Sequence, residues 1–141
     1  MDHVGNDGDG VVADGFVDAF PLSPAQLGMW YAQHLDPEVP INIAQYVDLH
    51  GVLDTEALRK ASAAAAADVG SGFLRILERD AQPMQVVDLT LDAPLTYVDF
   101  RDTEDPEAAA AAWMRAEYSK PIDIVEDRLI YAAALQLADD H

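Results

Sequence analysis

Residues 20–35, FPLSPAQLGMWYAQHL, most constrain the fold, because they specify where a helix begins and which face it buries. Ser23 can cap the helix by accepting a hydrogen bond from a free first-turn N–H. Pro24 suits the first helical position, where its missing N–H costs nothing. Gln26 follows Ser23 by three residues and can complete a capping box. The sequence therefore predicts a helix with a fixed start and one aromatic face, formed by Leu27, Trp30, Tyr31, His34 and Leu35.

Length and composition limit the function classes. A chain of 141 residues, half of them hydrophobic, is one domain or a piece of one. The formal net charge of −18 repels phosphate backbones and anionic lipid, so neither nucleic acid nor a membrane is expected as a partner. No apolar run is long enough for a membrane span, and there is no secretory signal. The lack of cysteine rules out disulfides and thiolate metal sites and fits a reducing cytoplasm.

The N-terminal residues differ from the rest of the chain. Residues 1–18 are rich in Gly and Asp and lack periodicity, so we predict a disordered acidic lead-in to a domain at 19–141. Asn6, Asp7 and Asp9 resemble part of a calcium loop, but the rest of the EF-hand spacing is missing. A solvated tail is the favoured interpretation.

Beyond residue 40 the pattern alternates between strands and helices. Residues 43–50 alternate in strand spacing and end at Gly51. Asp54 can cap a helix that runs through an alanine-rich stretch and ends by Gly70. Residues 73–78 and 84–87 predict a hairpin around 80–83, and 95–100 is a further strand candidate. A third helix is expected from Asp105 to about Tyr118, with Ala109, Ala112, Trp113 and Ala116 turned inward.

The last apolar run, residues 129–138, is apolar on both faces, which is typical of a central strand covered on both sides. A turn at 139–141 follows, with no partner strand after it. This favours truncation inside a domain and predicts an exposed apolar edge, with self-association through that edge strand.

Several of these motifs resemble the condensation domains of nonribosomal peptide synthetases. The segment from Ser23 to Trp30 fits the opening motif S-x-A-Q-x-R/G-[LM]-W, and residues 53–61 fit L-D-x-x-A-L-x-x-A. Residues 120–129 are similar to P-F-D-L-x-x-x-P-L, with Asp123 at the aspartate and Arg128 where proline is usual. The resemblance implies an α/β (α+β sandwich) fold, namely part of the N-terminal lobe of a chloramphenicol acetyltransferase-like fold, with a mixed sheet and helices packed on it.

The resemblance also has two departures. The usual R-H-E-x-L-R-T is replaced by D-V-G-S-G-F-L-R-I, in which Arg75 takes the place of the arginine of L-R-T. The catalytic signature H-H-x-x-x-D-G does not occur in this sequence and is expected a short strand beyond His141. The family's arginine pairs with the aspartate of that signature, so Arg75 should turn to solvent or find another carboxylate.

The resemblance assigns structural support roles to Ser23, Gln26, Trp30, Arg75 and Asp123. It implies that the intact parent joins a carrier-tethered acyl donor to an aminoacyl acceptor, with peptidyl carrier and adenylation domains as partners and a phosphopantetheine arm on the carrier. No catalytic, cofactor-binding or metal residue is expected in this chain, and the fragment itself should be inactive.

Two other functions remain open from the sequence. One is a fragment of a CoA-dependent acyltransferase of the same fold, which would use the same signature. The other is a non-catalytic interaction module, which requires a complete sheet without an exposed central strand. The four histidines do not indicate which function is correct, because none lies beside a nucleophile or at metal-ligand spacing. They are His3, His34, His50 and His141.

Overall fold

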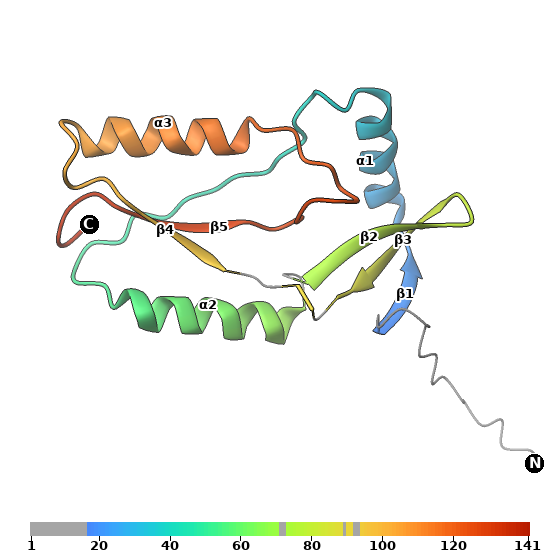
Figure 1. Ribbon diagram of the computed structural model, residues 1–141, viewed down its shortest axis with the longest axis horizontal. Coiled ribbons are helices and arrows are strands. Elements are labelled where there is room, and N and C mark those ends of the chain that lie inside the picture. Colours follow the sequence, from blue (N-terminus) through green and yellow to red (C-terminus); the bar gives the residue numbers. More distant parts are fainter. Residues whose placement is uncertain (1–16, 71–72, 89, 92–93) are drawn as a thin grey trace, which may run out of the picture.

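The computed structural model describes residues 17–70, 73–88, 90–91 and 94–141 (Figure 1). Its elements include both strands and helices, in agreement with the α/β prediction. In order they are β1 (Val17–Pro21), α1 (Pro24–Leu35), α2 (Thr55–Val69), β2 (Leu74–Arg79), β3 (Gln82–Val87), β4 (Leu95–Asp99), α3 (Pro106–Tyr118) and β5 (Ala132–Gln136).

The helix boundaries agree with the caps expected from the sequence. Ser23 caps α1 within a complete capping box. The carboxylates of Asp54 and Asp105 accept from the backbone N–H groups three residues on, at 2.9 and 3.0 Å. Helix α2 ends at Gly70, whose φ of 72° is the left-handed cap conformation that glycine adopts without steric cost. Local sequence alone therefore places all three helices.

The first sheet is antiparallel, with the strand order β1-β3-β2. Strands β2 and β3 form the predicted hairpin, and their connection is the two-residue turn Asp80-Ala81, both with positive φ. Strand β1 was not predicted. Val17 and Asp18, assigned to the lead-in by the sequence, belong to this strand, because the exposed edge of β3 supplies the partner that their own pattern does not reveal. Residues 1–16 of the predicted lead-in lie outside the described residues.

The second sheet contains two parallel strands, β4 and β5, in register from Leu95↔Ala132 to Asp99↔Gln136. The mixed sheet that was expected is therefore divided, with the antiparallel and parallel pairs in separate sheets. In Figure 1, α2 and α3 lie on opposite sides of the β4–β5 pair, and α1 stands over the β2–β3 hairpin. Strand β5, expected to be central, is paired on one edge only within the described part of the chain.

The strand predicted at 43–50 does not form. These residues have no regular secondary structure, and none of their backbone groups is in a backbone hydrogen bond with another described residue. A strand pattern specifies which face is apolar, but a ladder also needs a neighbour, and the described residues supply none. This segment crosses behind β5 in the view of Figure 1.

The buried face of α3 is also rotated from the prediction. Ala110 is buried, Ala109 and Trp113 are half-buried, and Ala112 and Ala116 are exposed. Alanines give little information about which face of a helix is buried, because each buries little area, so the rotation depends on the surface against which α3 packs.

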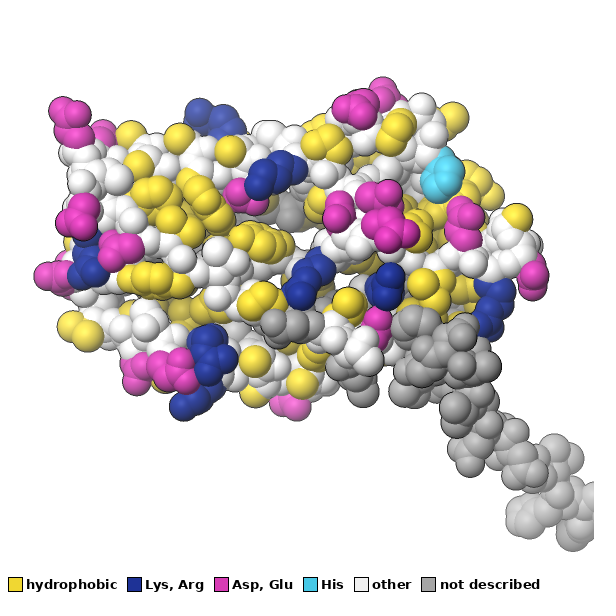
Figure 2. Space-filling view, in the orientation of Figure 1, with side chains coloured by type: hydrophobic (Ala, Val, Ile, Leu, Met, Phe, Trp, Pro, Cys, Tyr) yellow, Lys and Arg dark blue, Asp and Glu magenta, His cyan; other side chains and the backbone are white. Residues whose placement is uncertain are grey.

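The core is small for a chain of this length. Among the described residues, the buried hydrophobic side chains are Trp30, Ile76, Val86 and Ala110. Many large apolar side chains are exposed, and Figure 2 shows hydrophobic side chains reaching the surface over the β4–β5 region. None of the described helices is long and apolar enough to cross a bilayer.

Candidate functional site

Two glutamines tie the start of α1 to the first sheet. The backbone N–H of Ser23 donates to Oε1 of Gln26 at 2.9 Å, and the N–H of Gln26 donates to the Ser23 hydroxyl at 3.3 Å. Gln26 then donates through Nε2 to Oε1 of Gln85 on β3 at 2.9 Å, and Gln85 donates to the carbonyl of Pro21 at 3.0 Å. One side chain thus closes the capping box and positions the helix on the sheet.

Trp30 lies on the aromatic face of α1 and is buried. Its residue surface is 8% exposed, and its ring lies 3.9 Å from the His34 ring and edge-on to Tyr31 at 5.1 Å, measured between centroids. Nε2 of His34 lies 3.7 Å from a carboxylate oxygen of Glu78 on β2. The indole N–H has no acceptor among the described residues. These contacts give Trp30 a packing role in the junction of α1 and the hairpin.

Two amides that the sequence reasoning missed hold the segment after α3. Gln33, buried on α1, donates through Nε2 to the carbonyl of Ile122. Asn42 donates through Nδ2 to the carbonyls of Tyr118 and Lys120 at 2.9 and 2.8 Å. Because both contacts span more than seventy residues, no local pattern could have indicated them.

Asp123 organises the turn that follows. Its carboxylate accepts from the backbone N–H groups of Val125 and Glu126 at 2.9 and 3.2 Å, and its own N–H donates to Asp127 Oδ2 at 2.9 Å. The residue is exposed, and its hydrogen bonds go to the turn itself and to none of the other predicted support residues. Its geometry is that of an Asx-type turn, which shapes the chain between α3 and β5.

Arg75 pairs with a carboxylate, which is one of the two outcomes expected from the sequence. Its Nη1 lies 3.2 Å from Oδ2 of Asp88, whose side chain is 3% exposed, while that of Arg75 is 30% exposed. The other oxygen of Asp88 accepts from the hydroxyl and the N–H of Thr90, at 2.5 and 3.0 Å. The Thr90 hydroxyl, its N–H and the guanidinium of Arg75 hold the pKa of Asp88 below its usual value, although burial opposes this.

The predicted support residues do not form one site. Gln26 and Trp30 lie on α1, Ser23 caps it, and Gln26 contacts Gln85 on β3. Arg75 pairs in register with Val86, the neighbour of Gln85, so it projects from the other face of the hairpin. The residues predicted to give support therefore lie on both faces of the hairpin and, for Asp123, in the turn after α3.

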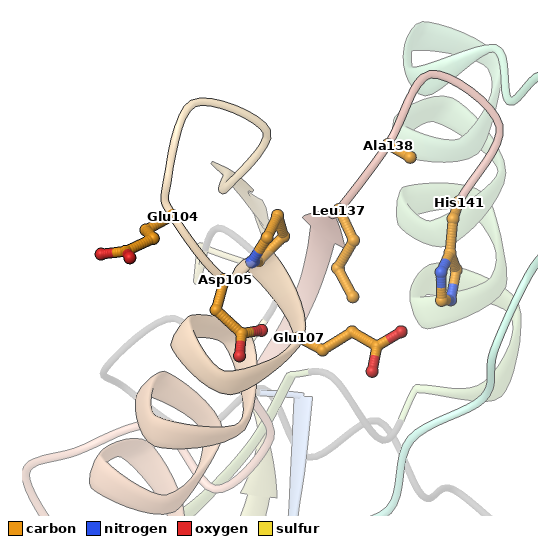
Figure 3. Close-up of a pocket in the computed structure, with 7 residues that line it drawn as sticks. Glu104, Asp105, Glu107, Leu137, Ala138 and His141 are labelled. Carbon is orange, nitrogen blue, oxygen red and sulfur yellow. The ribbon is translucent and has the colours of Figure 1, made fainter.

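A separate hollow of about 710 Å³ lies between the N-terminus of α3 and the turn after β5 (Figure 3). Its lining combines three acidic residues, three apolar residues and one imidazole, and consists of Glu104, Asp105, Pro106, Glu107, Leu137, Ala138 and His141. None of the predicted support residues lines it. The described residues contain no nucleophile in the hollow, and no group of three or more His, Cys, Asp or Glu among them could hold a metal ion.

His141 also contacts the segment before α2. Its ring lies 4.3 Å from that of His50, and its Nε2 lies 3.4 Å from Oδ1 of Asp48. The described residues place no nucleophile next to this pair. The arrangement joins the turn to residues 48–50.

Comparison with known proteins decides the family, because the profile of the condensation domain matches residues 17–141. The chain belongs to the condensation-domain family. The dimodular nonribosomal peptide synthase of Bacillus subtilis is 33% identical over 74% of the chain, and enterobactin synthase component F of Escherichia coli is 32% identical over 85%. These matches cover 4% and 10% of the two relatives, so the chain spans a small part of such synthetases.

Solved structures agree with this assignment. The starter condensation domain of rhizomide synthetase superposes with a TM-score of 0.83 and 31% identity over 88% of this chain and 32% of that one. The tallysomycin biosynthesis protein TlmII shares the fold at a TM-score of 0.72 and 19% identity, over 87% and 31% of the respective chains. The chain is thus an N-terminal part of a condensation domain with a chloramphenicol acetyltransferase-like fold.

Proposed function

We propose that residues 17–141 form the N-terminal scaffold of a condensation domain whose intact form makes an amide bond between a carrier-tethered acyl donor and an aminoacyl acceptor. The observation that carries this proposal is the match to the condensation-domain profile over all of the described residues. The superposition on the rhizomide domain supports it, because the likeness extends to the fold.

In the proposed reaction the acceptor's amine nitrogen attacks the carbonyl carbon of the donor thioester. The new C–N bond replaces the C–S bond, and the thiol of the donor's phosphopantetheine arm leaves with the proton. A histidine near neutral pKa suits the removal of that proton. We assign this role to the H-H-x-x-x-D-G signature, which does not occur in residues 1–141. Ser23, Gln26, Trp30, Arg75 and Asp123 support the lobe and touch no substrate.

The partners follow from the same proposal. Peptidyl carrier domains would deliver both substrates, and an adenylation domain would load the acceptor carrier. The net charge of −18 means that a docking patch for an acidic carrier must be locally neutral or basic. No cofactor is assigned to this chain itself, since the phosphopantetheine belongs to the carriers. The cytoplasmic location expected from the cysteine-free composition stays a prediction.

Two experiments test the proposal. The reading frame that contains this chain should encode H-H-x-x-x-D-G within a short strand after the codon for His141. The full-length protein encoded by that frame should join a carrier-bound acyl group to a carrier-bound amino acid, and the reaction should be detected by mass spectrometry of the acceptor carrier. The 141-residue chain alone should give no product above background. A reading frame without the signature, or a full-length protein that does not catalyse condensation, would contradict the proposal.

One observation favours a second donor class. A variant of the rhizomide starter condensation domain, 32% identical to this chain with a TM-score of 0.81, has been solved in complex with C8-CoA. An acyl-CoA could therefore replace the carrier-bound donor in the parent of this chain. The same assay with an acyl-CoA and with an acyl carrier separates the two donors.

The interaction-module alternative required a complete sheet, whereas β5 is paired on one edge only in the described part of the chain.

A further inference from the structure

The two ends of α1 contact the hairpin through different kinds of side chain. At the start of the helix, Gln26 donates to Gln85 on β3 at 2.9 Å, which is a contact between two neutral amides. In the last turn of the helix, Nε2 of His34 lies 3.7 Å from Oε1 of Glu78 on β2. Amides do not titrate, whereas an imidazole changes its charge near neutral pH. The second contact is therefore the one whose strength can depend on pH.

Both contacts use the same face of the hairpin. Ile76 is paired with Gln85 across the ladder, and directly paired residues project from one face. Glu78 lies two residues beyond Ile76 on β2 and therefore shares that face, which is buried at Ile76. Helix α1, which stands over the hairpin in Figure 1, is thus held to one face of it at both ends.

The ring of His34 lies between two hydrogen-bond acceptors. Its Nδ1 is 3.3 Å from the carbonyl oxygen of Trp30, and its Nε2 faces the carboxylate of Glu78. A neutral imidazole carries one N–H, so in either tautomer one ring nitrogen presents a lone pair to an oxygen. The charged ring carries two N–H groups and can donate to both acceptors. The geometry therefore suits the protonated form of His34.

Two further neighbours of His34 interact favourably with a positive charge. The residue lies in the last turn of α1, where the free carbonyl groups of the helix attract cations. Its ring lies against the indole of Trp30, with centroids 3.9 Å apart and planes inclined by 33°. At this separation a cation is attracted to the face of an aromatic ring. The charged ring thus gains contacts on α1 as well as with β2.

The other charged groups near this end of α1 leave Glu78 as the partner of His34. Helix α1 has no other charged side chain, and Asp36 follows as its C-cap residue. On the hairpin, Arg79 is next to Glu78 and projects from the opposite face, and Asp80 lies in the turn. In the part of the chain that the structure describes, Glu78 forms an ion pair with His34 and with no Lys or Arg.

The segment after α3 also contacts α1, through the hydrogen bond from Gln33 to the carbonyl of Ile122. Lys120 of this segment is paired with Glu117, and Asp123 accepts hydrogen bonds from its own turn. No charged side chain of this segment forms an ion pair with His34 or Glu78 among the described residues, the set being Lys120, Asp123, Glu126, Asp127 and Arg128.

We propose that protonation of His34 fastens the last turn of α1 to β2, while the contact between Gln26 and Gln85 holds the first turn at any pH. The attraction is present at acidic pH, where His34 is charged and Glu78 is ionised. It is lost as the pH rises and His34 becomes neutral, and the last turn of the helix then loosens. The inference concerns the scaffold and does not depend on the reaction assigned to the parent protein.

A double-mutant cycle in the full 141-residue chain tests this coupling. His34→Gln and Glu78→Gln replace two half-exposed side chains by neutral ones of similar size, so the variants should fold. Urea unfolding is measured at about pH 5.5 and about pH 8.5, on the two sides of the range in which histidine changes charge. At the acidic pH the two substitutions should be coupled by about two- to fivefold in the equilibrium constant for unfolding, as expected for a half-exposed ion pair. At the alkaline pH the coupling should nearly vanish.

Glu38→Gln is the matched control for the removal of one negative charge. Glu38 is exposed in the loop after α1 and forms no ion pair in the described part of the chain. Because the chain has a net charge of −18, the loss of any carboxylate relieves some repulsion, and the control measures that general effect. We expect no coupling between Glu38→Gln and His34→Gln at either pH.

Nitrogen NMR of the wild-type chain gives a measurement that needs no destabilising variant. The ring signals distinguish the two neutral tautomers from the charged imidazole, and His34→Gln identifies those of His34. Backbone hydrogen exchange gives protection factors along the helix. From the acidic to the alkaline pH, protection at Gln33, His34 and Leu35 should fall more than at Leu27, which lies in the first turn. Glu78→Gln should remove this difference.

Each outcome decides the inference. Coupling that is present at the acidic pH and absent at the alkaline pH, together with loosening of the last turn alone, supports it. Equal coupling at both pH values, no coupling at the acidic pH, or the same coupling with Glu38→Gln would overturn it. A His34 ring that carries one N–H at the acidic pH, or protection that changes equally at both ends of α1, would overturn it as well.

Discussion

Arg75 and Asp88 form an ion pair at the open end of the β2–β3 hairpin, with Nη1 of the arginine 3.2 Å from Oδ2 of the aspartate. The family resemblance assigns the partner of this arginine to a signature aspartate that the sequence does not contain. The chain instead neutralises it with its own buried carboxylate, which two hydrogen bonds from Thr90 hold in place. The hairpin can therefore hold this arginine without the signature.

Removal of the charge at Asp88 should destabilise the chain. Asp88→Asn leaves Arg75 without its carboxylate and weakens the hydrogen bonds from Thr90. We expect a loss of about 1–3 kcal/mol in the free energy of unfolding, measured by urea titration. Asp102→Asn is the matched control, because Asp102 is exposed, and it should change the stability by less than about 0.5 kcal/mol. Equal effects of the two substitutions would contradict a stabilising ion pair.

The contribution of Asp88 to the free energy of unfolding should decrease as the pH falls. Its pKa in the folded chain lies below the ordinary 3.8, so the ionised form stabilises the fold. This stabilisation is fully present above the ordinary value and is lost as the pH falls through the lower folded value. The stability difference between the wild type and Asp88→Asn should therefore shrink as the pH is lowered from neutral to about 2.5. A difference that stays constant over that range would show that Asp88 does not titrate with a lowered pKa.

Gln26 should contribute to stability through two separable contacts. Gln26→Glu keeps an acceptor for the Ser23 N–H but loses the donor to Gln85, and Gln26→Ala loses both. We expect losses of about 1 kcal/mol for the first and about 2 kcal/mol for the second in thermal or urea unfolding. In the Gln85→Ala background the cost of Gln26→Glu should nearly vanish, since the contact is already absent. Additive costs would show that the two glutamines are not coupled.

The hairpin turn offers a stabilising substitution. Asp80 and Ala81 have φ of 52° and 61°, and an alanine in this region carries a steric cost that glycine avoids. Ala81→Gly creates the Asp-Gly pair favoured in such turns and should raise the unfolding free energy by about 0.5–1 kcal/mol. Ala65→Gly, at an exposed position within α2, is a control of opposite sign and should lower the unfolding free energy by about 1 kcal/mol. A loss of stability in Ala81→Gly would contradict the turn conformation.

Self-association through the free edge of β5 should be weak and salt-dependent. The edge can pair with a second copy, but the net charge of −18 opposes the contact. Sedimentation of the purified chain should show monomer at low salt and a growing dimer fraction at about 0.5 M NaCl, where screening shortens the range of the repulsion. A dimer fraction that does not change with salt would show that charge repulsion does not limit the association.

The sequence by itself determined the helix starts and the hairpin. Ser23, Asp54 and Asp105 accept from N–H groups three residues away, and Gly70 ends α2 through its own φ, so the necessary partners lie within one turn of chain. The family motifs likewise sit on local elements. Because an unpaired buried charge is costly, Arg75 could be predicted either to reach solvent or to pair with a carboxylate, but the choice between the two and the identity of Asp88 could not be predicted.

Only the tertiary structure decided which surfaces meet. Strand β1 forms because β3 offers an edge, whereas residues 43–50 have the better pattern and form no strand, because the described chain offers them no neighbour. The contacts of Gln26 with Gln85, Gln33 with Ile122 and Asn42 with Tyr118 join residues far apart in sequence. A strand pattern specifies which groups need partners, while the supply of those partners depends on distant parts of the chain.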